Sequence, residues 1–463
     1  MHVTVFQNVP FDQLEIGMEA ETRRLCVADD LYVFAHASGN LNPMHLPHED
    51  GDKDGKPEAV APSFWVGSLI SSVLGNRLPG PGTLYKSQSL RFLGRAHAGD
   101  KLVARVKLIR KENDRCAVFH TTVSLADGTL LVDGEAEVIA PDKKDSFDAH
   151  DVPGLTVESH RHFDKLLEMA EPLPAIRTAI VAPEDVNSLR GALLAAEHTI
   201  IIPILIGDQD KITRTAQENG LSLDGIEIIH CTNHTEASQI AVNMIHEKRA
   251  AAIMKGHLHT DDLLRPILRS NGGLKTGRRI SHIFVMDVPG LPHVLMVTDA
   301  AINIAPDLPT KVDIVQNAID LAQSLGIKLP KVGILSAVET VNPKIPSTLD
   351  AAALSKMAER GQITGGIVDG PLAMDNAVSL AAARTKGLKS LVAGCAEILV
   401  VPNLESGNML AKELSFIAHA EAAGVVMGAS CPIILNSRSD SDKSRLASCA
   451  VAALHAHRMQ GLL

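Results

Sequence analysis

Polar residues that could bind an anion gather in four short stretches, each directly after an apolar run. The stretches are MKGHLHTDDLLRPIL (254–268), GLKTGRRISH (273–282), VDGPLAMDNAVS (368–379) and LNSRSDSDKSR (435–445). In the last of them, Ser437 and Arg438 offer a hydroxyl and a guanidinium, which are donors that suit a phosphate group. The carboxylates of Asp440 and Asp442 follow at once. This pattern predicts a site for a phosphate-like anion.

Three arginines in the other stretches are further phosphate-binding candidates. Arg265 lies in LLRPIL, and Arg278 and Arg279 form the pair in GRRISH. Isolated arginines of this kind are often solvated surface residues, and Asp375 and Asn376 can equally be read as helix-capping residues. Four polar clusters that each follow an apolar run nevertheless favour a common site.

A second candidate site lies near the start, in the stretch FAHASGNLNPMH (34–45). Its turn residues present Asn40 and His45 on one loop, five positions apart. An imidazole can exchange a proton near neutral pH, whereas an amide cannot act as a base. The acidic run HEDGDKDG that follows lacks the glutamate which would complete a calcium loop, so we expect no metal there.

Composition narrows the class of protein. The chain has 463 residues, enough for two or three domains, and a formal net charge of -10, which argues against nucleic acid as the main partner. Its six cysteines show no metal-ligand spacing and are expected to be reduced thiols. Without an apolar run long enough for a membrane span, and with a start unlike a signal peptide, we expect a cytoplasmic protein with no membrane partner.

The first part of the chain predicts one buried helix and an antiparallel sheet. APSFWVGSLISSVLGN (61–76) has apolar residues at helical spacing after a proline. Alternating apolar residues then predict strands at 101–108, in CAVFHTTVSL (116–125) and at 130–138, with ADGT as a hairpin turn. The charged stretch 141–155 is expected to be a linker, which gives domains at 1–150 and 156–463.

Beyond residue 156, short apolar runs such as TAIVAP, TIIIPILIG and KVGILSAV alternate with longer helical stretches. This rhythm predicts an α/β domain with a largely parallel sheet, in which ligands collect at the carboxyl ends of the strands. A dinucleotide enzyme is disfavoured, because no G-x-G-x-x-G stands between a strand and a helix in this region.

The four polar stretches, together with GNMLAKELSF, VPNLESGN and TDAAINIAPDL, resemble the phosphate acetyltransferase and phosphate butyryltransferase family. The resemblance covers nearly all of 156–463. It implies two α/β subdomains and direct transfer of a short acyl group from CoA to phosphate, without a metal or other cofactor. GPLAMDNA and similar motifs look closer to the butyryl branch, but forms fused to another domain are similar to proteins usually called acetyltransferases, so the acyl length stays open.

This resemblance also implies roles for individual residues. Ser437 and Arg438 would bind phosphate and neutralise the charge that develops in the transition state. A downstream aspartate would take the proton of the CoA thiol, whose pKa is ordinarily about 8.5. Asp440 and Asp442 are both available for that role, and Asp440 is preferred.

The first region resembles the MaoC-like (R)-specific enoyl-CoA hydratases of the hot-dog fold, through 34–45, LPGPGTLYKSQSLRF and AGDKL. That family uses an aspartate and a histidine of this loop to activate water, and a glycine that opens the buried helix to bind the thioester oxygen. His45 matches the histidine, but Asn40 stands at the aspartate position and Ser63 at the glycine position. The resemblance therefore implies a hydratase of altered activity, or a domain that only binds acyl-CoA or mediates dimerisation.

Together these features predict a two-domain enzyme that acts on acyl-CoA, phosphate and acyl phosphate, and both resemblances imply a homo-oligomer. The rival from another class is a non-catalytic sensor that binds acyl-CoA as a regulator. Retention of Ser437, Arg438 and the nearby carboxylates disfavours the sensor.

Overall fold

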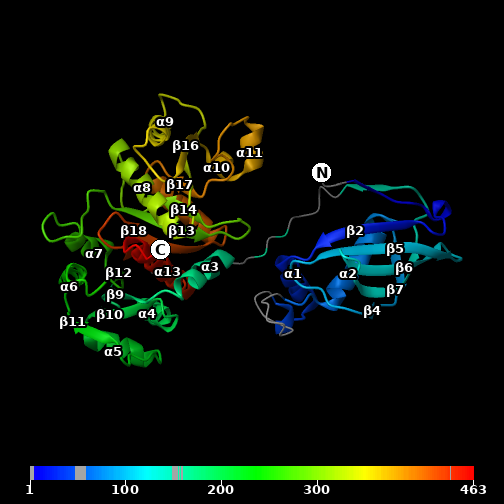
Figure 1. Cartoon of the computed structure of the whole chain (residues 1–463), viewed down its shortest axis with the longest axis horizontal. Helices are drawn as coiled ribbons and strands as arrows, with labels where there is room; N and C mark the ends of the chain where they lie inside the picture. Colours follow the sequence, from blue (N-terminus) through cyan, green and yellow to red (C-terminus); the bar gives the residue numbers. More distant parts are fainter. Residues whose placement is uncertain are drawn as a thin grey trace. The chain divides into compact units, whose positions relative to one another are not determined.

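The computed structural model describes residues 5–46, 59–148, 155, 157, 160–437 and 440–462. The chain forms two compact units, residues 1–157 and residues 158–463 (Figure 1). Each unit has its own hydrophobic core.

In the first unit, one buried helix packs on a curved antiparallel sheet, which confirms the expected hot-dog architecture (Figure 1). The strands follow the order β2-β5-β6-β7-β3, and β4 pairs with β7. Trp65, Ile70 and Val73 bury one side of helix α2 against the sheet. The elements are α2 (Ser63–Asn76), β2 (Glu19–Leu25), β3 (Leu84–Gln88), β4 (Arg91–Phe92), β5 (Lys101–Lys111), β6 (Cys116–Leu125) and β7 (Leu130–Ile139).

Several smaller elements of this unit were not expected from the sequence. They are α1 (Ala28–Ser38), two short 3-10 helices, η1 (Phe11–Gln13) and η2 (Pro43–His45), and the paired strands β1 (Val5–Gln7) and β8 (Ser146–Asp148). Strand β8 lies inside the charged stretch expected to be a linker. It forms there because pairing with β1 satisfies main-chain groups and needs no apolar side chains. Residues 149–154 of that stretch lie outside the described residues.

The second unit is built on one eleven-stranded sheet of order β11-β10-β9-β12-β19-β18-β13-β14-β17-β15-β16. Two parallel groups, β11 to β19 and β14 to β16, are joined through the antiparallel strands β18 and β13. The largely parallel α/β sheet is thereby confirmed. The strands are β9 (Ile176–Val181), β10 (Ile201–Gly207), β11 (Glu227–His230), β12 (Ala252–Lys255), β13 (Ser281–Asp287), β14 (Leu295–Thr298), β15 (Lys331–Leu335), β16 (Ile367–Leu372), β17 (Ile398–Val400), β18 (Glu421–Met427) and β19 (Ile433–Ile434).

Helix α13 (Asp442–Met459) is buried along nearly its whole length against α3, α4 and β18, and residues 446–454 in its middle are all small or apolar. A helix of this composition is stable only inside a large core. The other helices are α3 (Arg161–Ala170), α4 (Val186–Glu197), α5 (Gln209–Glu218), α6 (His234–His246), α7 (Thr260–Ile267), α8 (Leu308–Ser324), α9 (Pro346–Glu359), α10 (Met374–Val378), α11 (Leu380–Thr385) and α12 (Leu404–Phe416). Among the described residues, none of these helices has the length and apolarity needed to cross a bilayer.

Candidate functional site

Three neighbouring parallel strands, β9, β12 and β19, bring polar residues to one edge of the second unit's sheet. Lys255 ends β12, while Asn436 and Ser437 follow β19. Because the carboxyl ends of parallel strands meet at the same edge, residues almost 200 positions apart become neighbours. The long-range topology thus assembles the site.

The turn after β12 lies unusually close to the end of β9. The N–H of Gly256 donates to the carbonyl of Val181 at 2.8 Å, and the N–H of His257 donates to that of Ala182 at 2.6 Å. A Cβ at Gly256 would lie 2.3 Å from the Ala182 oxygen. Only glycine fits at this point, so the turn places Lys255 and His257 beside the end of β9.

A cavity of about 170 Å³ at this edge contains two buried cations. We call it the anion pocket; its lining is Asp185, Val186, Asn187, Lys255, Gly256, His257, Asn436, Ser437 and Arg445. Lys255 is 8% exposed and Arg445 is 4% exposed. Buried positive charge is costly unless an anion compensates it. The pocket is therefore suited to a small, highly charged anion.

The guanidinium of Arg445 is held by one backbone carbonyl, and its Nε–H remains available as a hydrogen-bond donor. Its Nη2 donates to the carbonyl of Ser437 at 2.8 Å, whereas its Nε has no hydrogen-bond partner among the described residues. A Cβ at Gly191 would lie 2.8 Å from Arg445 Cδ, so this glycine of α4 leaves the space that the arginine occupies. The guanidinium is positioned by tight packing between α4 and α13.

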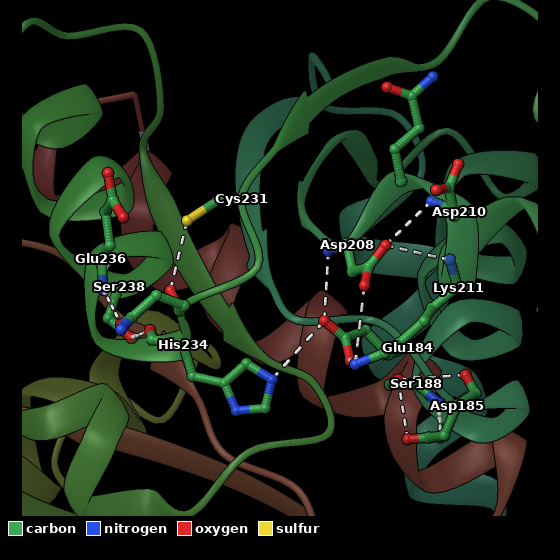
Figure 2. A network of polar contacts seen from close by, with 12 residues as sticks. Glu184, Asp185, Ser188, Asp208, Asp210, Lys211, Cys231, His234, Glu236 and Ser238 are labelled. Carbon is green, nitrogen blue, oxygen red and sulfur yellow. Dashed lines mark hydrogen bonds and ion pairs between the residues drawn. The ribbon is translucent and has the colours of Figure 1, made fainter.

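The N-terminus of α4 adds a further positive field to the anion pocket. Asp185 caps the helix by accepting from the N–H of Ser188 at 2.9 Å and from its hydroxyl at 3.0 Å (Figure 2). Val186 and Asn187, which line the pocket, belong to the first turn, where N–H groups lack partners within the helix. Such termini bind anions well.

A second, larger cavity of about 350 Å³ adjoins this site, and we call it the α12 pocket. Its walls combine apolar residues such as Phe284 and Ala411 with polar ones such as Lys412 and Asp440. Ser437 lines both the α12 pocket and the anion pocket. Ser437 therefore lies where ligands in the two cavities would meet.

Asp440 closes the loop around Ser437. Its Oδ2 accepts from the N–H of Ser437 at 2.7 Å and from Asn436 Nδ2 at 3.2 Å. Burial raises the pKa of the Asp440 carboxyl above its usual value, and the nearby Glu421 carboxylate contributes in the same direction. A carboxylate with a raised pKa is a stronger base, and it lies in the α12 pocket.

Asp442 and Arg265 lie apart from these cavities. Asp442 is the first residue of α13 and forms an ion pair with Arg190 at 3.8 Å. Arg265, in α7, is 64% exposed and lies 3.9 Å from Asp262. Neither residue lines the anion pocket or the α12 pocket.

Arg278 and Arg279 lie at the opposite edge of the sheet, just before β13. The other end of that strand pairs with Glu421, which lines the α12 pocket, so the strand's length separates the two arginines from Ser437. Arg278 forms an ion pair with Asp320, and Arg279 donates its N–H to Asp313. The structure does not bring these arginines together with Ser437.

Arg438, a predicted phosphate-binding residue, lies outside the described residues. Lys255, His257 and Arg445 were not singled out from the sequence, although all three stand in the polar stretches noted there. The usable signal was the lysine directly after the apolar run AAIM, at the end of a predicted strand. No similar feature of the sequence indicated that the N-terminus of α4 would contribute to the site.

In the first unit, the loop after α1 carries Asn40 and His45. Asn40 is exposed, and its Oδ1 accepts from the N–H of Asn42 at 3.3 Å. His45 Nδ1 lies 2.7 Å from the carbonyl of Val60, so that nitrogen is the donor and Nε2 carries the lone pair. The imidazole is thus oriented as a base, while Asn40 has no proton-accepting group.

Ser63 opens helix α2 in the same neighbourhood. The N–H of Val60 donates to the carbonyl of Met44 at 3.1 Å, which joins the His45 segment to the chain three residues before Ser63. Ser63 is exposed, and the N-cap residue before it, Pro62, makes no side-chain capping hydrogen bond. The histidine and the start of the helix are therefore brought together by main-chain pairing.

Comparisons with known proteins agree with this geometry. Residues 231–453 match the family described as phosphate acetyl/butaryl transferase. The phosphate acetyltransferase of Rhizobium meliloti is 56% identical over 296 residues, which are 64% of this chain and 94% of that protein.

Two solved structures extend the comparison. A branched-chain phosphotransacylase from Enterococcus faecalis is 32% identical, with a TM-score of 0.54, and the match covers 61% of this chain and 99% of that one. An (R)-hydratase from Pseudomonas aeruginosa is 35% identical over 33% of this chain and 99% of its own, with a TM-score of 0.32. Because the R. meliloti relative is matched over nearly its whole length at high identity, the chain belongs to the phosphate acetyl- and butyryltransferase family.

Proposed function

We propose that the second unit transfers a short acyl group, acetyl or butyryl, between CoA and inorganic phosphate. The observation that carries this proposal is the position of Ser437, shared by a small pocket with buried cations and a larger pocket of mixed polarity. Phosphate fits the first pocket by charge and size, and the acyl-CoA thioester fits the second. The activity named for the R. meliloti relative supports the same reaction.

In the proposed reaction, an oxygen of phosphate forms a bond to the thioester carbon, and the bond from that carbon to sulfur breaks. Lys255, Arg445 and the α4 N-terminus hold the phosphate, while Ser437 and Arg438 stabilise the charge that develops on the reacting groups. The proton lost by phosphate passes through Asp440 to the departing thiolate. In the reverse direction, Asp440 takes the thiol proton, the CoA sulfur forms a bond to the acyl carbon of acyl phosphate, and the bond from that carbon to oxygen breaks to release phosphate.

The test is release of CoA from acetyl-CoA and from butyryl-CoA, with and without phosphate, together with detection of acyl phosphate. We expect phosphate-dependent release that survives a chelator, because none of the proposed steps uses a metal. Tight binding of acyl-CoA without phosphate-dependent release would instead support the acyl-CoA sensor. The ratio of the rates with the two substrates decides the acyl length.

For the first unit, we propose binding of acyl-CoA with slow or absent hydration of the enoyl double bond. His45 is oriented as a base, but Asn40 cannot take a proton. The first unit therefore lacks the carboxylate that the resembled hydratases use together with the histidine. This activity is measured directly as hydration of crotonyl-CoA, which is monitored through the loss of the absorbance of the substrate. A rate of crotonyl-CoA hydration equal to the rate of acyl transfer by the second unit would overturn the proposal.

We also propose that the protein is a cytoplasmic homo-oligomer. The substrates named here are cytoplasmic metabolites, and both resemblances imply self-association. Light scattering of the purified full-length chain tests the oligomer, and a monomeric mass at micromolar concentration would contradict it.

A further inference from the structure

Glu184 is a buried carboxylate at the same sheet edge as the anion pocket, but it does not line that pocket. Its side chain is 5% exposed. Lys211 Nζ lies 3.0 Å from it, the N–H of Asp208 donates to it at 3.2 Å, and His234 Nε2 lies 3.6 Å away (Figure 2). The carboxylate thus connects the loops after β9, β10 and β11.

The backbone of Glu184 is also fixed from both sides. Its carbonyl accepts from the hydroxyl of Thr215 in α5 at 3.1 Å, and its N–H donates to the carbonyl of Ala182 at 2.9 Å. The same Ala182 carbonyl accepts from the N–H of His257, which lines the anion pocket. A movement of Glu184 would therefore displace both the turn after β9 and the pocket wall opposite.

Glycine at the end of β10 makes room for this arrangement. A Cβ at Gly207 would lie 3.2 Å from Ala182 Cα and 3.5 Å from the Glu184 carboxylate. Directly after Glu184, Asp185 caps α4, and Val186 and Asn187 enter the pocket. The contacts of Glu184 therefore act on the residue directly before the cap of α4.

We propose that Glu184 is a positioning residue for phosphate: by tying the turn after β9 to Lys211 and His234, it aims the N-terminus of α4 into the anion pocket. This inference rests on the proposed function, in which that pocket holds phosphate. Glu184 does not touch the ligand. Its loss weakens phosphate binding through the displaced helix terminus.

The test compares Glu184→Gln with Glu227→Gln in the full-length protein. Glu227 is the control for loss of an ion-paired carboxylate, because it also joins two cations, Arg177 and Arg249, but at the opposite end of the same strands and at 40% exposure. We expect Glu184→Gln to raise KM for phosphate about fivefold, since a helix terminus contributes on the order of 1 kcal/mol to anion binding. KM for acyl-CoA should stay within twofold for both variants.

A similar rise in KM for phosphate and in KM for acyl-CoA, together with a large fall in Tm, would show a merely structural role for Glu184 if it is seen in Glu184→Gln and not in Glu227→Gln. That result would overturn the proposal. An unchanged KM for phosphate would overturn it as well. If Glu184→Gln does not fold, Lys211→Met serves instead, because it removes one of the three contacts from a half-exposed position. It should raise KM for phosphate about twofold with no change for acyl-CoA.

Calorimetric titration with inorganic phosphate separates this inference from the proposed function. If the wild-type protein binds phosphate without turnover and Glu184→Gln binds it more weakly, the positioning role stands and the transferase proposal fails. If the wild-type protein turns over and Glu184→Gln binds phosphate equally well, only the positioning role fails. If the wild-type protein neither binds phosphate nor turns over, both fail.

Discussion

The two units assemble their candidate sites in opposite ways. In the first unit, Asn40, His45 and Ser63 come from 24 consecutive residues, and short-range hydrogen bonds to Val60 join the His45 segment to the chain just before Ser63. In the second unit, the anion pocket combines four segments between Asp185 and Arg445, joined by strand order and by a buried helix. A local motif can lose one chemical group and keep its shape, whereas a site from distant segments depends on the whole fold.

The difference extends to the charges that each site holds. The first unit presents a half-buried imidazole at His45 and an exposed amide at Asn40, and neither group is a buried charge. The second unit buries Lys255 and Arg445 in the lining of one cavity, and buried charges depend strongly on the groups that surround them. We therefore expect substitutions in the second unit to cause losses of activity, and substitutions in the first unit to allow a gain. Four experiments test this contrast.

The largest effect is expected at Arg438. Arg438→Ala should lower acyl transfer on the order of 100-fold or more, because it removes a donor that stabilises transition-state charge. Arg438→Lys should restore little, since an ammonium lacks the bidentate fork. Steady-state rates of CoA release measure both variants. Crotonyl-CoA hydration by the first unit should not change, and near-wild-type transfer in either variant would remove Arg438 from the site.

The next effect is expected at Lys255, the buried cation at the end of β12. Lys255→Met keeps much of the side-chain volume and removes the charge, so KM for phosphate should rise about thirtyfold, as for loss of a charged hydrogen bond. KM for acyl-CoA should change little, because Lys255 does not line the α12 pocket. Equal changes in both constants would contradict the division into two pockets.

A smaller effect, of opposite sign, is expected in the first unit. Asn40→Asp supplies the carboxylate that the resembled hydratases use beside the histidine, and it should raise crotonyl-CoA hydration on the order of tenfold. The double variant with Ser63→Gly should rise further. Acyl transfer by the second unit serves as the control for folding. A wild-type protein that hydrates rapidly and is slowed by Asn40→Asp would show that Asn40 works in a different mechanism.

The smallest effect concerns stability and pH at Asp440. Burial raises the pKa of this carboxyl in the folded state, so the native protein binds the proton more strongly than the unfolded chain does. The stability from that proton is present below the unfolded pKa of about 4 and is lost as the pH rises through the raised folded pKa. The Tm of Asp440→Asn relative to wild type should therefore be higher at pH 7 than at pH 4. A pH-independent difference in Tm would contradict this.

Much of the fold could be predicted because its signals are local. The helical spacing of Trp65 and Val73 predicted α2, and the alternation in CAVFHTTVSL predicted β6 with its observed bounds. Helix α1 was missed because few of its residues are buried, which leaves a weak periodic pattern. Strand β13 (SHIFVMD) was also missed, although it is almost wholly buried like the strands predicted from apolar runs, because its first two residues were assigned to the polar stretch 273–282.

By itself, the sequence determined many of the short segments that form helices and strands, such as α2 and β6, and it placed Ser437 and Asp440 in one polar loop because neighbours in a chain stay neighbours in space. Only the tertiary structure decided that Lys255 and Arg445 join this loop and that Arg278 and Arg279 lie at the far edge. The physical reason is that strand order and direction are set by packing between distant segments, which no local pattern of residues encodes. The same packing set the α4 N-terminus and its carboxylate support at Glu184.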